Sequence, residues 1–269
     1  HTTMQRLLKF TLDLFAPTAP VISRHPDSTQ QTNINGQLID YRLLRSRRRT
    51  MIFSVSAEGL AVRAPYGMPM HTVEQAVQEK GRWIVRKLGG MQERQARVDA
   101  SRINWLEAPK LDFLGQQVHV IVASNESCTR LQPSNGLNDM PSLLLALPAH
   151  ANGKKIRDTT QDWLKEQATV LYTERLNHFA EQLGVTWETL HLSNANTRWG
   201  SAKADGSIRL HWRLIQFSPD VIDYVVVHEL SHLHELNHSH RFWAIVASVF
   251  PDYLDLEKKL KLAVLPPWE

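Results

Sequence analysis

The strongest constraint on the fold is a histidine-containing segment preceded by a helix-start signal. Ser218-Pro219-Asp220 supplies a capping serine, a proline in the first turn and an acid beside the positive helix end. His228-Glu229-Leu-Ser-His232 follows it. Residues four apart on a helix project from the same side, one turn apart, so both imidazoles face one way. We therefore expect a helix from this start to about Leu236.

The opposite side of this expected helix is apolar. Ile222, Val226, Leu230 and Leu233 recur at helical spacing and are predicted to pack into a core. Polar side chains without partners are costly to bury. We therefore expect the two imidazoles and Glu229 to line a cleft.

A third imidazole follows ten residues after the first, at His238. It can reach the other two if the helix ends before it, and Asn237 is the expected stop because Asn tolerates the left-handed conformation. Ser239 is then expected to cap the next helix. Imidazoles placed in this way can bind Zn²⁺, and a carboxylate beside them can take a proton from the metal's water. We predict one zinc ion per chain, held by His228, His232 and His238, with Glu229 as the catalytic base.

Composition narrows the setting of this site. The chain has 269 residues, a net charge of +4 and a single cysteine. One cysteine, Cys128, excludes an internal disulfide framework, so the reducing cytoplasm is the expected location. No apolar run approaches the ~20 residues that span a bilayer, so no membrane partner is expected. The mild charge does not indicate a nucleic-acid partner, although a local basic patch could still matter. Nothing in the sequence indicates an oligomeric state.

The first half of the chain predicts strands. Residues 1–36 are rich in Pro, Ser, Thr, Gln and Asn and show no sustained period, so we expect a loosely ordered segment. Residues 37–150 predict a β-rich subdomain with one helix, at about 71–95, which Gly89-Gly90 could interrupt. A hairpin turning at Gly115 is expected in this subdomain.

The second half, residues 151–269, predicts mostly helices. A long helix is expected at 154–183, with Gly184 as its stop. A hairpin is expected around Ala204-Asp205-Gly206, beside the histidine helix. The predicted fold class is α+β.

Several motifs resemble the YgjP-like metal-dependent hydrolases, which are similar in turn to the SprT/Spartan zinc proteases. The resemblance covers roughly Leu38 to Phe250 and implies a zincin-like catalytic half with the same three histidine ligands and the same catalytic glutamate. The family often has Cys after Trp-Gly-Ser, whereas this chain has Ala202, which argues against a catalytic or redox role for that side chain. The motifs that carry the resemblance are Arg198-Trp-Gly-Ser201, Gly206-x-Ile208-x-Leu210-x-Trp212-Arg213, Asp223–His232, Asn237-His-Ser-x-x-Phe-Trp243 and Arg45-x-Arg-Arg-Arg49.

The function expected from these features is zinc-dependent hydrolysis, most simply of peptides. Some members of the family are linked instead to nucleotide pyrophosphate hydrolysis. A nucleoside triphosphate pyrophosphohydrolase with the same metal site is therefore one alternative, and a SprT-like DNA-associated protease is another. The substrate is thus expected to be a peptide or a nucleotide.

Five further residues are candidates for substrate binding. Trp199 fits a cleft wall or the core equally well. Arg198 and Arg213 could bind an anionic group or form structural ion pairs. Arg45 and Arg47 belong to a basic run, residues 45–49, that could bind phosphate or could be a solvated strand edge that discourages pairing.

Four more histidines stand outside the expected ligand set. His240 could support the ligands, and His234 is expected to face solvent. His191 and His211 are expected to be strand residues rather than ligands.

Overall fold

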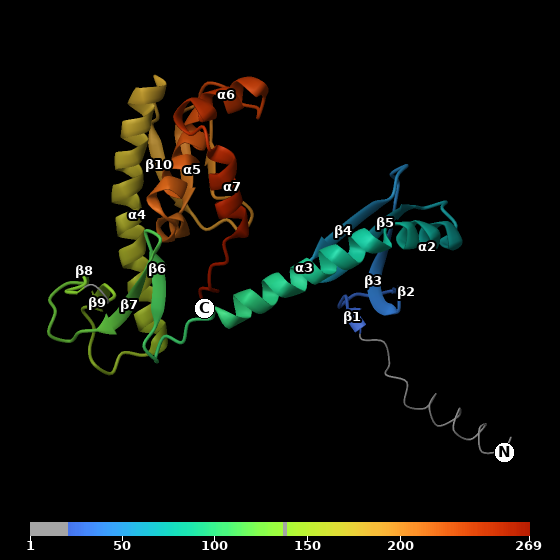
Figure 1. Ribbon diagram of the computed structural model, residues 1–269, viewed down its shortest axis with the longest axis horizontal. Coiled ribbons are helices and arrows are strands. Elements are labelled where there is room, and N and C mark those ends of the chain that lie inside the picture. Colours follow the sequence, from blue (N-terminus) through green and yellow to red (C-terminus); the bar gives the residue numbers. More distant parts are fainter. Residues whose placement is uncertain (1–20, 137–138) are drawn as a thin grey trace, which may run out of the picture. The chain divides into compact units, whose positions relative to one another are not determined.

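The computed structural model describes residues 21–136 and 139–269 (Figure 1). The chain divides into two units, the first ending at Ala100 and the second running from Ser101 to Glu269. No helix in the described part of the chain is both long enough and apolar enough to cross a membrane.

The first unit is a five-stranded sheet with two helices. The path of the sheet is β1-β3-β5-β4, with β2 paired to β3. Helix α3 packs against β1, β4 and β5, and the core holds side chains such as Ile39, Leu60, Val62, Val73 and Ile84. The elements are β1 (Val21–Ser23), β2 (Gln30–Ile34), β3 (Gln37–Ser46), β4 (Ile52–Ser56), β5 (Gly59–Pro65), α2 (Met70–Glu79) and α3 (Gly81–Ala100).

Two expectations for this unit need correction. Residues 1–20 of the expected loose segment lie outside the described residues, but residues 21–36 hold β1 and β2, so the expectation is wrong there. β2 pairs antiparallel with β3 through a turn in which Asn35 and Gly36 have φ of 52° and 84°. Asn-Gly is a strong hairpin signal that the polar composition of the segment obscures.

The helix expected at about 71–95 is two helices that meet at Lys80, and it is not interrupted at Gly89-Gly90. Gly81 begins α3 against β2, where an added Cβ would lie 2.7 Å from the Cγ2 of Ile34. The break therefore falls where the second helix closes onto the sheet, and this tertiary contact leaves no mark on the periodicity.

The second unit contains two small sheets and most of the helices. One sheet has the order β6-β7-β9-β8 and the other the order β10-β12-β11. The long helix α4 packs against α5, η1, β9 and β10 (Figure 1). The elements are β6 (Lys110–Phe113), β7 (Gln116–Val122), β8 (Arg130–Gln132), β9 (Ser142–Leu145), α4 (Gly153–Leu183), β10 (Thr189–Ser193), β11 (Gly200–Ala202), β12 (Ser207–His211), the 3₁₀ helix η1 (Trp212–Gln216), α5 (Pro219–Ser231), α6 (His240–Val249) and α7 (Tyr253–Leu262).

Local signals in this unit agree with the structure. Leu114 and Gly115 have φ of 50° and 77° in the hairpin between β6 and β7, and Gly206 has φ of 85° between β11 and β12. Gly184 ends α4 in the left-handed conformation, as its position after the helical run predicts.

The boundary expected near residue 150 is not where the structure divides. Strands β6–β9, which were expected in the N-terminal subdomain, lie in the second unit. Leu111, Val118 and Leu143 share one buried cluster with Val226 and Leu230 of α5. An alternating pattern predicts a strand, but it does not reveal which core the buried side of that strand joins.

Candidate metal centre

The core fixes the position of α5. Ile222, Val226 and Leu230 are completely buried, and Leu233 is partly buried, so the predicted apolar side is confirmed. The Arg175 guanidinium of α4 donates to both carboxylate oxygens of Asp223, at 2.7 and 2.9 Å. Helix α5 is therefore held along its length before any ligand is considered.

The start of α5 is where the sequence predicts it. Ser218 is the N-cap, but its hydroxyl donates to the Asp220 carboxylate and makes no capping bond to a backbone N–H. The Asp220 carboxylate instead accepts from the backbone N–H of Val221, at 3.0 Å. The acid in the first turn thus performs part of the role expected of the serine.

The end of α5 differs from the prediction. The helix stops at Ser231 and not near Leu236, and His232 is its C-cap with right-handed dihedral angles. The next three residues form turns whose N–H groups bond to Leu230 and Ser231. Asn237 does not have a positive φ, so it is not the left-handed stop. The early end gives the chain enough length to return to the helix at His238.

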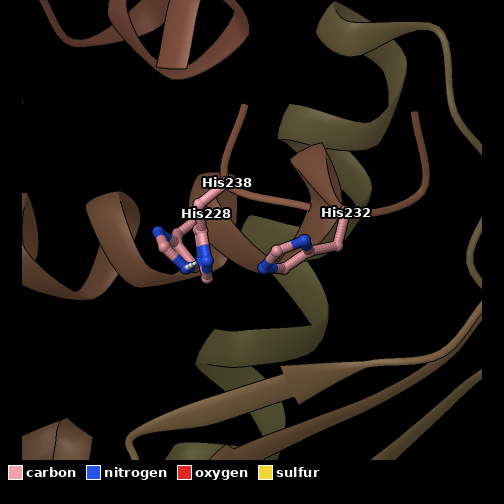
Figure 2. A group of neighbouring side chains, drawn as sticks. All are labelled: His228, His232 and His238. Atoms are coloured by element: carbon pink, nitrogen blue, oxygen red, sulfur yellow. Dashed lines mark hydrogen bonds between the residues drawn. The ribbon is translucent and has the colours of Figure 1, made fainter. Parts of the chain in front are cut away.

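Three imidazoles converge at this end of α5 (Figure 2). One ring nitrogen from each of His228, His232 and His238 lies within 4.8 Å of the others. The Nε2 atoms of His228 and His238 are 3.1 Å apart. Two nitrogens bound at 2.0–2.1 Å to one tetrahedral ion lie about 3.3–3.4 Å apart. The three residues therefore fit a metal ion.

The backbone selects the donor atom of His232. Its Nδ1 lies 3.1 Å from the carbonyl oxygen of Glu235, so an N–H on Nδ1 donates to that carbonyl. The lone pair of the neutral ring is then on Nε2, which is free to face a metal. The Nδ1 of His228 is buried and has no partner among the described residues.

Aromatic side chains of α6 support the three imidazoles. The ring of Phe242, which is completely buried, lies 4.9, 4.5 and 4.8 Å from the rings of His228, His232 and His238. Trp243 stacks against His238, with ring centroids 5.7 Å apart. Ser239 caps α6 as predicted, since its Oγ accepts from the N–H of Phe242 at 3.3 Å.

Burial keeps His228 and His232 neutral. Desolvation, and then the neighbouring rings of His232 and His238, lower the pKa of His228 to about 3. The pKa of His232 is also lowered, mainly by burial. An imidazole must be unprotonated to bind a metal, so at neutral pH these two rings are ready to act as ligands.

Glu229 lies beside the imidazoles and is only 5% exposed. Burial raises the pKa of its carboxyl to about 8, against the opposing effect of the Arg198 guanidinium. A bound cation lowers the pKa of such a group. Strand β11 passes directly over the carboxylate, because a Cβ added to Gly200 would lie 2.5 Å from its Oε1. Glycine is therefore required at this position for the strand and the glutamate to approach each other.

The imidazoles and Glu229 open onto one cavity of about 540 Å³. Strand β11 forms one wall and α7 another, through Leu260 and Lys261. Tyr224 also lines it, four residues before His228 on α5. Burial, and then the nearby Glu257, Tyr253 and Glu229, raise the pKa of Tyr224 to about 12. Its hydroxyl is therefore protonated at neutral pH and able to donate.

Sequence reasoning missed Tyr224, Gly200 and the α7 wall. The spacing of Tyr224 from His228 was a usable signal, since it equals the spacing of the two ligand histidines on the same helix. Gly200 and α7 reach the cavity only through tertiary packing, and no local pattern reveals them.

The five candidate substrate-binding residues fall into three places. Arg198 and Trp199 line the cavity, and Trp199 also packs edge-on against His211 and Phe217, so it is both wall and core. Arg213 does not line it and faces a different cavity. Arg45 and Arg47 belong to the first unit. There Arg45 donates to the carbonyls of Pro65 and Met68, at 2.9 and 2.7 Å, and Arg47 is exposed beyond the end of β3.

The four other histidines singled out from the sequence lie apart from the three imidazoles. His240 is exposed at the start of α6 and does not line the cavity. His234 is exposed, with its Nε2 2.8 Å from the carbonyl oxygen of Leu183. His191 is exposed on β10, and His211 is buried at the end of β12.

Three comparisons relate the chain to known proteins. A comparison with curated proteins found no match. One solved structure, the metallopeptidase zymogen of Pyrococcus abyssi abylysin, is similar over 36% of this chain and 99% of its own, at 23% identity and a TM-score of 0.32. The model of the YgjP-like metallopeptidase domain matches residues 49–263. The chain therefore belongs to the YgjP-like metallopeptidase domain family and is accordingly a metal-dependent hydrolase.

Proposed function

We propose that the chain is a zinc-dependent peptidase in which His228, His232 and His238 hold one zinc ion and Glu229 is the general base. The observation that carries the proposal is that three imidazoles and one buried carboxylate open onto a single cavity. Among residues 21–136 and 139–269 the metal-ligating group consists of these three imidazoles, and three imidazoles without a thiolate or a fourth protein ligand are typical of catalytic zinc, which keeps an open position.

Zinc held by these three histidines would polarise water and the carbonyl group of a substrate. Glu229 takes a proton from the attacking water and passes it to the leaving amine. Because the side chain is buried, its carboxylate is poorly solvated and accepts a proton more readily than an exposed one. Gly200 supports this role, since the strand backbone above the carboxylate restricts where it can move.

A peptide substrate is supported by the edge of the sheet. Strand β11 pairs with β12 on one side only and lines the cavity on which the imidazoles open. An extended peptide can add to such an edge through main-chain hydrogen bonds. The scissile carbonyl then lies between the imidazoles and Tyr224, whose hydroxyl donates to the oxygen as negative charge develops.

The test compares the zinc-loaded wild type with Glu229→Gln. Quenched fluorescent casein reports peptide cleavage, and pyrophosphate release reports cleavage of nucleoside triphosphates. We expect the wild type to cleave casein and Glu229→Gln to retain one zinc per chain while losing activity about 10²-fold or more. Pyrophosphate release without casein cleavage would assign the site to nucleotides instead. Full activity in Glu229→Gln would refute the role of the glutamate.

A further inference from the structure

A second cavity, of about 480 Å³, lies in the same unit and shares no lining residue with the first. It is bordered by the end of β12, by η1 and by the last residues of the chain. Its polar lining includes Arg157, Asn194, His211, Arg213 and Glu269, and the indole of Trp268 contributes an apolar side. Its volume is within the range of small-molecule sites, about 300–1,000 Å³.

The Arg213 guanidinium is held firmly in this cavity. Its Nε donates to the Oε1 of Gln216 at 2.9 Å, and the Nε2 of Gln216 donates to the Asp112 carbonyl at 3.2 Å, which fixes the orientation of the amide. The guanidinium carbon lies 5.7 Å from the ring centroid of Trp212 and 5.3 Å from that of Trp268. The two rings themselves pack edge to face, with centroids 5.0 Å apart, so the guanidinium is pre-positioned against an aromatic pair.

This guanidinium carries a positive charge without a matching anion. Its Nη2 is buried and has no hydrogen-bond partner, and it forms no ion pair with any carboxylate in the described part of the chain. Burial lowers the pKa of Arg213 to about 10, which still leaves the group protonated at neutral pH. A charged donor buried without a partner is more unfavourable than a neutral donor in the same position. The lining acid Glu269 is already paired with Arg102.

Other donors accompany Arg213. The Nε1 of Trp268 is also buried without a partner among the described residues. The Nδ1 of His211 accepts from the backbone N–H of Arg213 at 3.0 Å. Burial lowers the pKa of His211 to about 4, so the ring is neutral and carries its proton on Nε2. The cavity thus offers N–H groups and one uncompensated positive charge.

We propose that this cavity binds a small oxyanion, a carboxylate or phosphate group, with the Nη2 of Arg213 as its principal donor. Guanidinium N–H groups match the oxygens of both anions, and charge-assisted bonds of this kind are stronger than neutral ones. The two indole rings hold the guanidinium plane in place, so little side-chain freedom is lost when the anion binds. The proposal is independent of the proposed peptidase activity, because the two cavities share no residue.

The experiment is a titration of the metal-loaded full chain with inorganic phosphate and, separately, with acetate at constant ionic strength. Tryptophan fluorescence reports binding, because Trp212 and Trp268 both contact the Arg213 guanidinium. We expect saturable binding in the wild type and a weakening of about tenfold or more in Arg213→Gln. Arg209→Gln is the matched control, because this substitution makes the same change in net charge at an exposed residue of β12. Tighter binding of phosphate than of acetate would indicate a phosphorylated ligand, and the reverse order a carboxylate.

Several outcomes would overturn the proposal. One is the absence of saturable binding of either anion by the wild type at millimolar concentrations. Another is equal binding by Arg213→Gln. Binding that persists in Arg213→Gln but disappears when the metal is removed would place the anion at the other cavity. If Arg213→Gln does not fold, Trp268→Phe removes one donor and keeps a ring at that position, and unchanged affinity in this variant would count against the site.

Discussion

Replacing Gly200 by alanine should separate the position of Glu229 from the binding of metal. The added Cβ would lie 2.5 Å from the Oε1 of Glu229 and 2.7 and 2.8 Å from its Cγ and Cδ. Ordinary van der Waals contact begins at 3.4 Å, so the carboxylate must retreat by about 0.9 Å. Because Glu229 is only 5% exposed, it cannot move freely into solvent.

This displacement has a predictable effect on the rate. A misplacement of about 1 Å in a reacting group costs about 10²-fold in rate. We therefore expect the kcat of Gly200→Ala to fall by about 10²-fold, with metal content unchanged because the three atoms nearest to the added Cβ all belong to Glu229. Hydrolysis of quenched fluorescent casein gives the rate, and inductively coupled plasma mass spectrometry gives the zinc content.

Gly153→Ala is the matched control for this substitution. Gly153 begins α4 in the same unit, and the nearest atoms to its added Cβ are at 3.5 Å or more, which is ordinary contact. Its activity should equal that of the wild type. A Gly200→Ala variant with wild-type kcat would refute the reasoning, and so would one that lost its zinc in proportion to its activity.

Three further substitutions test other parts of the site. His238→Ala should lose most of the bound zinc, because two imidazoles remain where three were. The control His240→Ala should keep its zinc, because His240 is exposed and lies outside the cavity. Zinc content is measured on protein purified without a chelating resin, and equal zinc in the two variants would contradict the role of His238. Tyr224→Phe should lower kcat for casein by about 10- to 10²-fold with little change in KM, since its hydroxyl is proposed to act only on the developing charge; unchanged kcat would exclude that role. Arg175→Met should reduce the free energy of unfolding by about 1–2 kcal/mol, because its two hydrogen bonds to Asp223 are lost. Urea unfolding followed by circular dichroism measures this free energy, and an unchanged value would contradict the stabilising role of the pair.

The convergence of the three imidazoles could be predicted because its geometry is mostly local. The spacing of His228 and His232 on one helix places both rings on one side whatever the rest of the fold does. His238 could be expected to reach the other two rings because the helix ends before it. Ser239, the N-cap of α6, marks the start of the next helix. The predicted end of α5 was wrong because the actual end depends on how the chain returns to the other two imidazoles. Helix propensity does not encode that return.

Other features could not be predicted because they depend on which surfaces meet. Strands β6–β9 were correctly expected as strands in part, but their core partner, α5, lies far along the chain. Arg213 lies in η1, two residues after the end of β12, and looked like a candidate for the same site as Arg198, yet the two guanidinium groups face different cavities. A single sequence gives the spacing of such residues along a strand, and the fold decides where each one points.

The three imidazoles differ in how their own chain segments are held, and this difference bears on how a metal would leave. His228 is partly buried on α5, whereas His238 is exposed and belongs to the short connection between α5 and α6. The indole of Trp243 stacks against the His238 ring. Dissociation should therefore begin with His238, and the rate at which a competing chelator extracts the ion should follow the opening of this connection. Trp243→Ala should accelerate that extraction more than it weakens the equilibrium affinity, which makes the tryptophan a kinetic barrier to metal loss.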